Sequence, residues 1–159
     1  MIRSTVEPRV FIIPRRATNV FYNTTSPGVG AQGSEPDEYN YFFGPNGLYR
    51  VGGPGGPPFF AVDQTYQQIV DRESDALVTY MFRYELYPSM YHQANFYFYD
   101  NQHTLFTDVI DAALTKFKQM SNLPVSDSKT LSVTADSGDA SPAIIELPMC
   151  RFGPALPVT

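Results

Sequence analysis

The chain has 159 residues and a formal net charge of -5, with 43% hydrophobic, 14% aromatic and 17% charged residues. This length favours one domain over two, and the hydrophobic fraction is sufficient for one core. The negative net charge disfavours non-specific binding of nucleic-acid phosphates by the main body, and the single cysteine, Cys150, excludes an internal disulfide.

The first 22 residues contain two apolar clusters, at 10–13 and 20–22, each long enough only for a short strand. Pro8 and Pro14 bracket the first cluster. Because proline cannot donate a hydrogen bond to a sheet ladder, we expect a short or edge strand there. The N-terminus lacks an apolar run of signal-peptide length, and no stretch of the sequence is apolar enough for a membrane span. We therefore expect a protein that is made inside a cell, is not secreted by a signal peptide and has no membrane partner.

Four arginines form a basic tip near the N-terminus, where only Glu7 opposes them. A tip of this kind favours contact with an acidic neighbour, and the alternative is a set of solvated arginines on an edge strand. The four residues are Arg3, Arg9, Arg15 and Arg16.

Residues 26–58 differ in composition from the rest of the chain, because they hold nine of its eleven glycines and six of its fourteen prolines. This density of residues that interrupt regular structure predicts no helix and no central strand. Seven aromatic residues between positions 39 and 60 argue against a disordered linker. We therefore predict a long, ordered, extended N-terminal arm over residues 1–60 that buries its side chains on other subunits. Its expected contact residues are Phe11, Ile13, Phe21, Tyr39, Tyr41, Phe42, Phe43, Tyr49, Phe59 and Phe60.

The segment after the arm predicts a short helix and then an antiparallel hairpin. Asp63 is placed to cap a helix over 64–72. Apolar and polar residues alternate over 76–87 and over 90–99, which predicts two half-buried strands. A three-residue turn at 87–89 brings the two apolar sets onto one face of the hairpin. The opposite face carries three tyrosines that suit a wet contact surface, namely Tyr91, Tyr97 and Tyr99.

The strongest predicted element is a helix over 104–121. Thr104 or Asn101 is placed to cap its start, and Asn122 with Pro124 is placed to stop it. One broad apolar stripe runs along the helix and must be covered by another element. The stripe consists of Leu105, Phe106, Val109, Ile110, Ala113, Leu114 and Phe117.

This helix packed on the hairpin gives an α+β fold with a small antiparallel sheet and one long amphipathic helix. The alternative is an all-β sandwich or jelly roll with one helix. Two further strands are predicted over 130–135 and 143–147. We predict three parts, namely an extended arm over 1–60, a compact α+β domain over 61–148 and an irregular tail over 149–159.

The sequence offers few residues for chemistry. His92, His103 and Cys150 match no zinc spacing. The glycine-rich stretch 52–56 lacks the Gly-Lys-Ser/Thr ending of a phosphate loop. A cluster of three acidic residues is expected to be a solvated loop rather than a carboxylate pair, and it consists of Asp71, Glu73 and Asp75. We predict no catalytic, cofactor or metal site, and we predict that the protein is not an enzyme.

The combination of an ordered arm, an apolar tail and tyrosine-rich surfaces favours an assembly subunit of a large symmetric particle. Within that class we expect a phage or viral decoration (cement) or minor capsid protein, located in the virion and bound to copies of itself and to other subunits. The alternative is a head-tail connector or tail component. Other classes that remain open are a carbohydrate-binding module that uses the exposed tyrosines and a small enzyme of unrecognised type.

Overall fold

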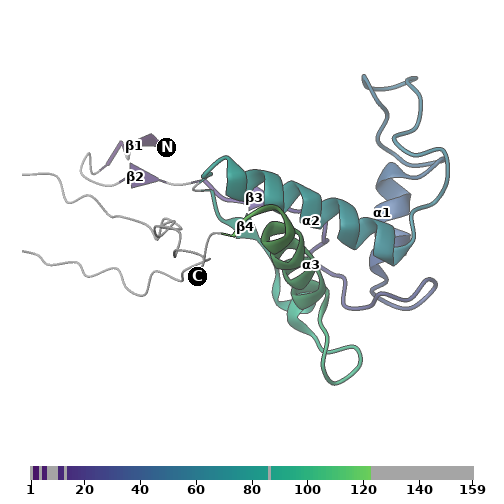
Figure 1. Cartoon of the computed structure of the whole chain (residues 1–159). Helices are drawn as coiled ribbons and strands as arrows, with labels where there is room; N and C mark the ends of the chain where they lie inside the picture. Colours follow the sequence, from purple (N-terminus) through teal and green to yellow (C-terminus); the bar gives the residue numbers. More distant parts are fainter. Residues whose placement is uncertain (1, 4, 7–10, 13, 86, 123–159) are drawn as a thin grey trace, which may run out of the picture.

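The computed structural model describes residues 2–3, 5–6, 11–12, 14–85 and 87–122, and it has a small, largely helical fold (Figure 1). Its helices are α1 (Glu35–Phe43), α2 (Tyr66–Phe82), the 3-10 helix η1 (Gln93–Phe96) and α3 (Leu105–Met120). Its strands are β1 (Ile2–Arg3), β2 (Phe11–Ile12), β3 (Arg16–Ala17) and β4 (Ser89–Met90). The predicted mixture of helix and strand is confirmed.

The predicted antiparallel sheet of residues 76–99 is wrong. Each strand in the described part of the chain has two residues, with β1 paired antiparallel to β2 and β3 paired parallel to β4. The predicted strands at 130–135 and 143–147 and the tail at 149–159 lie outside the described residues.

Helix α3 confirms the prediction of a helix over 104–121. The Thr104 side chain accepts a hydrogen bond from the Thr107 backbone N–H and caps the first turn. The residues that the structure buries recur every four positions, which places them on one face of the helix. They are Leu105, Val109, Ala113 and Phe117.

Helix α2 replaces both the predicted short helix at 64–72 and the predicted strand at 76–87. The cap is Thr65 and not Asp63, and Gln68 closes a capping box with it. The alternation of apolar residues that suggested a strand also fits a helical stripe, because the partly buried Leu77 and Met81 lie four positions apart and pack with Val78. The seventeen residues of α2 contain no glycine or proline, so nothing interrupts the helix.

The predicted strand at 90–99 contains instead the end of β4, the helix η1 and a loop. Asn95 explains the change, because it is fully buried and its side-chain oxygen accepts a hydrogen bond from the His92 backbone N–H at 2.9 Å. A residue with this local bond favours a turn over a strand ladder.

Helix α1 contradicts the prediction that residues 26–58 contain no helix. The Ser34 side chain caps it, and Pro36 lies in the first turn, where a missing N–H costs nothing. The neighbouring glycines, Gly33 and Gly44, lie outside the helix. A Cβ on Gly44 would stand 2.6 Å from the Asn40 carbonyl oxygen, so this helix end requires glycine.

The core lies where α2 crosses α3 (Figure 1). One cluster joins Val20, from the segment after β3, to Val70, Leu105 and Val109. A second cluster joins Val78 to Ala113 and Phe117. Residues 14–24 therefore belong to the folded body of the described chain, although the sequence placed them in an arm. No helix in the described part of the chain is long and apolar enough to cross a bilayer.

Candidate functional site

Helix α1, the loop that follows it and Phe21 from the preceding segment form a cluster of eight aromatic rings, which we name the aromatic platform. Phe42 stacks on Tyr49 with ring centroids 5.2 Å apart, and Phe21 stacks on Phe42 at 5.0 Å. Tyr39 contacts Phe43 at 4.9 Å. The platform consists of Phe21, Tyr39, Tyr41, Phe42, Phe43, Tyr49, Phe59 and Phe60.

Backbone hydrogen bonds fix the loop onto the last turn of α1. The Leu48 N–H donates to the Tyr41 carbonyl at 3.0 Å, and the Tyr49 N–H donates to the Phe42 carbonyl at 2.9 Å. Gly47 permits this approach, because a Cβ there would stand 2.5 Å from the Phe42 carbonyl oxygen. The platform is therefore held by contacts within this chain.

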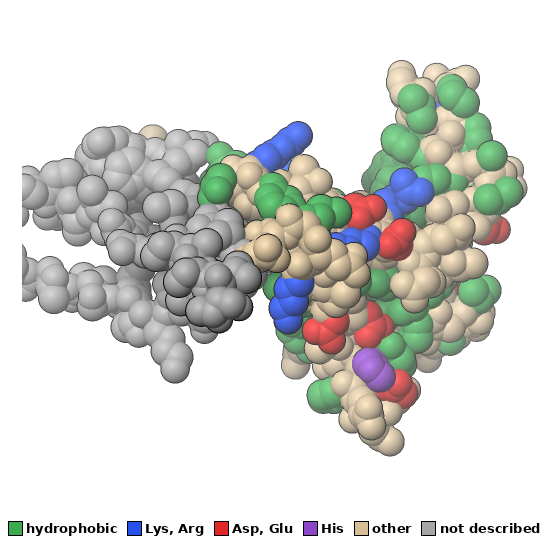
Figure 2. All heavy atoms as spheres, viewed as in Figure 1, with side chains coloured by type: hydrophobic (Ala, Val, Ile, Leu, Met, Phe, Trp, Pro, Cys, Tyr) green, Lys and Arg blue, Asp and Glu red, His purple; other side chains and the backbone are tan. Residues whose placement is uncertain are grey.

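The outer side of the platform is apolar and open to solvent. The exposed large apolar residues of α1 and of the loop that follows it form what we name the apolar patch, and their exposed fractions lie between 47% and 59%. Figure 2 shows hydrophobic side chains over α1 and the loop at the upper right of the molecule. Apolar groups that gather on one face are typical of contact surfaces. The patch consists of Tyr41, Leu48, Tyr49, Val51 and Phe59.

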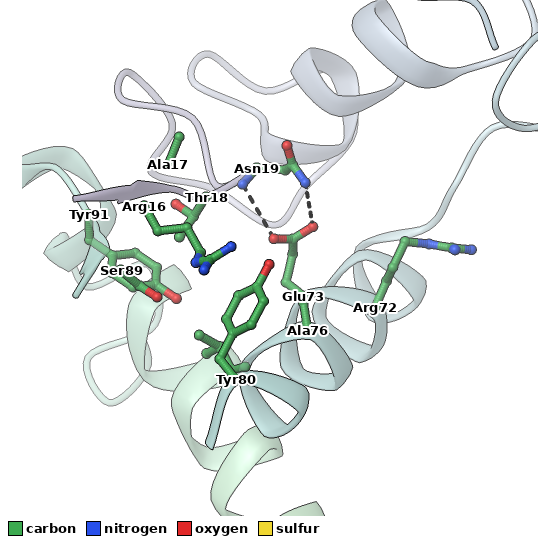
Figure 3. A pocket seen from close by; sticks show the side chains of 11 residues that line it. Arg16, Ala17, Thr18, Asn19, Arg72, Glu73, Ala76, Tyr80, Ser89 and Tyr91 are labelled. Carbon is green, nitrogen blue, oxygen red and sulfur yellow. Dashed lines mark hydrogen bonds between the residues drawn. The ribbon is translucent and has the colours of Figure 1, made fainter. Parts of the chain in front are cut away.

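A polar pocket of about 220 Å³ lies between α2 and the β3–β4 pair (Figure 3). Glu73, Ala76 and Tyr80 line it from one face of α2, since residues three and four apart share a helix face. Arg16 and Asn19 line it from β3 and the segment after it.

Glu73 provides the buried carboxylate of this pocket, with 8% of its surface exposed. Asn19 holds it through two hydrogen bonds, from its side-chain amide to Oε1 at 2.8 Å and from its backbone N–H to Oε2 at 3.3 Å. Among the residues that the structure describes, no cation forms an ion pair with Glu73.

Arg16 enters the pocket from β3, but its charge is already paired. One of its Nη atoms donates to the Glu85 carboxylate, and its guanidinium carbon lies 3.9 Å from the centre of the Tyr80 ring. Its Nε is buried without a hydrogen-bond partner in the described structure. Arg16 therefore lines the pocket with its charge paired by Glu85, which is not a lining residue.

A second buried acid, Glu35, lies at the start of α1 with 1% of its surface exposed. Its Oε2 accepts hydrogen bonds from the Thr24 hydroxyl at 2.7 Å and from the Phe21 N–H at 3.2 Å. Burial raises the pKa of Glu35 to about 8, although these two hydrogen bonds oppose the shift. Glu35 thus joins α1 to the preceding segment.

The three tyrosines predicted on a strand face lie outside the strands of the described chain and differ in their surroundings. The ring of Tyr91 packs edge-on against Phe106 at 4.9 Å. The Tyr99 hydroxyl donates to Asp108 Oδ2 at 2.6 Å, whereas Tyr97 is exposed. The predicted strand face is therefore wrong, whereas the role of these tyrosines as contact residues stays a prediction.

The basic tip is also divided. Arg15 is exposed, and Arg16 lies in the pocket. Arg3 lies in β1 and Phe11 in β2, while Arg9 and Ile13 lie outside the described residues.

The histidines have local partners. The His92 ring lies edge-on to Tyr22 with centroids 5.9 Å apart, and His103 Nδ1 lies 2.7 Å from Asp100 Oδ2. No group of three or more His, Cys, Asp or Glu residues in the described ranges could hold a metal ion, and Cys150 lies outside these ranges.

Sequence reasoning missed the role of Glu73 because it assigned the residue to a solvated acidic loop with Asp71 and Asp75. On a helix, Asp71 and Asp75 share one face and Glu73 lies on the other. A helix over this segment was the signal that would have separated them.

No protein-family model matches the chain, and neither a curated protein nor a solved structure shows significant similarity to it.

Proposed function

We propose that this chain is a binding subunit of a protein assembly and that a neighbouring subunit covers its apolar patch. The observation that carries the proposal is the combination of exposure and order in the patch. Tyr41 and Tyr49 expose more than half of their surface, yet both rings contact the Phe42 ring. The backbones of both residues are also fixed, because the Tyr41 carbonyl accepts a hydrogen bond from Leu48 and the Tyr49 N–H donates one to Phe42.

Order of this kind favours binding, because side chains that are already fixed lose little conformational entropy when a partner covers them. Tyrosine contributes large contact area with only two torsions, and it is enriched in interface cores. The exposed Leu48 and Val51 extend the apolar area beyond the rings. The proposal therefore assigns binding to the chain and no catalysis.

The aromatic residues contribute differently from the sequence expectation. Tyr39, Phe42 and Phe43 pack on one another within the chain, so they build the platform and need no neighbour to bury them. The proposed contact consequently involves only the exposed residues of the patch. The assignment to a phage or viral particle remains a prediction of the sequence, and the binding proposed here does not depend on it.

Self-association tests the proposal, since copies of the chain are the partners expected first. Sedimentation analysis of the full chain over a range of concentrations should show a monomer that passes into oligomers. The double variant Leu48→Ser, Val51→Ser should shift this transition to higher concentration, because both side chains are exposed and their loss removes contact area without opening the core.

The matched control is Met120→Ser, which removes an exposed apolar side chain at the end of α3. This variant should associate like the wild-type chain. The proposal fails for self-association if the wild-type chain stays monomeric at every concentration, or if the control weakens association as much as the double variant does.

A further inference from the structure

The polar pocket between α2 and β3–β4 has features that the apolar patch does not explain. Its volume of about 220 Å³ is below the roughly 300–1,000 Å³ of pockets for drug-sized ligands, so it suits a molecule of few heavy atoms. Its walls combine one buried carboxylate with two tyrosines, Tyr80 and Tyr91 (Figure 3).

The Glu73 carboxylate has neutral hydrogen-bond donors but no cation. Asn19 provides both of its hydrogen bonds in the described structure. A buried charge without an opposite charge is costly, and an ion of opposite sign at hydrogen-bond distance offsets that cost. Glu73 therefore favours a positively charged group in the space beside it.

The two arginines that line the pocket do not meet this need. Arg16 is paired with Glu85 and lies over the Tyr80 ring. The guanidinium of Arg72 lies 4.4 Å from the centre of the Phe60 ring, and in Figure 3 its side chain extends away from Glu73. Neither arginine therefore pairs with the negative charge of Glu73, which borders the pocket.

The tyrosines add to the preference for a cation. Aromatic faces attract ammonium groups through the ring quadrupole. Burial, together with a smaller contribution from the negative charge of Glu73, raises the pKa of Tyr91 to about 12. The charge of Glu73 therefore acts on the groups that surround the pocket.

We propose that this pocket binds a small primary amine as its ammonium ion, with the ammonium group on the Glu73 carboxylate and the alkyl part along Ala76 and Tyr80. A bound ammonium donates to a carboxylate that already has its position fixed by Asn19. This site is separate from the apolar patch, and neither proposal requires the other.

Titration of the full chain with n-propylammonium, n-propanol and propionate, followed by NMR chemical shifts, tests the charge preference. The three probes have nearly the same size and differ in charge. Propylammonium should shift the signals of Asn19 and of residues around Glu73 and bind about tenfold or more tighter than propanol, as expected for a charged hydrogen bond. Equal binding of propanol, or tighter binding of propionate, would overturn the proposal.

Two variants locate the site. Glu73→Gln keeps an acceptor for the Asn19 amide but removes the charge, and it should weaken propylammonium binding about tenfold or more. Ala76→Leu keeps the carboxylate and fills the cavity, and it should also block binding. The matched control Asp111→Asn removes an exposed carboxylate from α3 and should bind like the wild-type chain.

The shape of the thermal unfolding curve shows whether each variant is folded. If Glu73→Gln unfolds the chain, Ala76→Leu carries the test alone. Wild-type affinity in a folded Glu73→Gln or Ala76→Leu chain, or an equal loss in Asp111→Asn, would show that the amine binds the acidic surface in general and would sink the proposal.

Discussion

The helix pair α2–α3 and the N-terminal segment of residues 14–24 are held in the fold by different kinds of contact. The two helices meet mainly through apolar residues at helical spacing, such as Val78 and Phe117. The preceding segment contributes Val20 to this apolar core, and buried polar groups of η1 and α1 also hold it. Asn95 donates to the carbonyls of Phe21 at 2.7 Å and Thr24 at 3.1 Å. Apolar burial depends little on pH, whereas a buried acid couples its contacts to protonation.

The largest expected effect is the pH dependence of the unfolding free energy that Glu35 causes. Its folded-state pKa of about 8 lies above the ordinary value of 4.5, so between these values the folded chain keeps a proton that the unfolded chain has lost. The stabilisation is complete below pH 4.5 and is lost as the pH rises through about 8. At about 1.4 kcal/mol per pKa unit, the loss is on the order of 5 kcal/mol.

Chemical unfolding across this pH range measures the effect. Glu35→Gln should flatten the decline and be more stable than the wild-type chain above pH 8, because no buried charge forms. Glu38→Gln removes a half-buried carboxylate from the same helix and should keep the wild-type slope, since Glu35 is still present. An unchanged slope in Glu35→Gln would contradict the role given to this acid.

Phe117→Ala tests the apolar half of the comparison. Phe117 exposes 1% of its surface and lies 5.0 Å from the Phe82 ring. Removal of a buried aromatic ring leaves a cavity and costs about 3–5 kcal/mol. Because the lost contacts are apolar, the free-energy difference from the wild-type chain should be the same on both sides of the Glu35 titration.

Denaturant titration at two pH values checks this expectation. Met120→Ala, an exposed position in the same helix, should change the unfolding free energy by about 0.5 kcal/mol or less. A strong pH dependence of the Phe117→Ala difference would show that the two regions are energetically coupled, and the comparison would then break down.

The same contrast explains which elements were predictable from the sequence. Helix α3 was predicted within about one residue, because a period of four in Leu105, Val109 and Ala113 is visible in the sequence itself. Helix α1 was missed because composition averaged over 26–58 hid a short segment with its own cap, Ser34. Capping and proline at the first turn are local signals, and they outweighed the density of glycine and proline around them.

The candidate site was less predictable than the helices. Arg16 and Glu73 are 57 residues apart, by subtraction of their positions in the sequence, and only the tertiary fold places both in one pocket. The aromatic residues of the arm were identified as contact residues, but their contacts are largely with one another. Sequence indicates that such rings must be buried and does not indicate on what.

Lys116 gives the smallest expected effect and limits how far charge contributes to the α2–α3 pair. Its Nζ lies 2.6 Å from both Asp71 Oδ1 and Asp75 Oδ1. Partial burial acts to lower the pKa of Lys116, but the two aspartates raise it overall. Both aspartate side chains are more than 60% exposed, so solvent screens the pairs.

Lys116→Met keeps most of the side-chain length and removes the charge, and it should cost less than about 1 kcal/mol. The control Lys118→Met removes an exposed lysine from the last turn of α3, which has no ion pair in the described part of the chain. The difference between the two variants should shrink as salt is added, because screening weakens exposed pairs. A loss of several kcal/mol that salt leaves unchanged would mean that charge, and not apolar burial, holds α2 to α3.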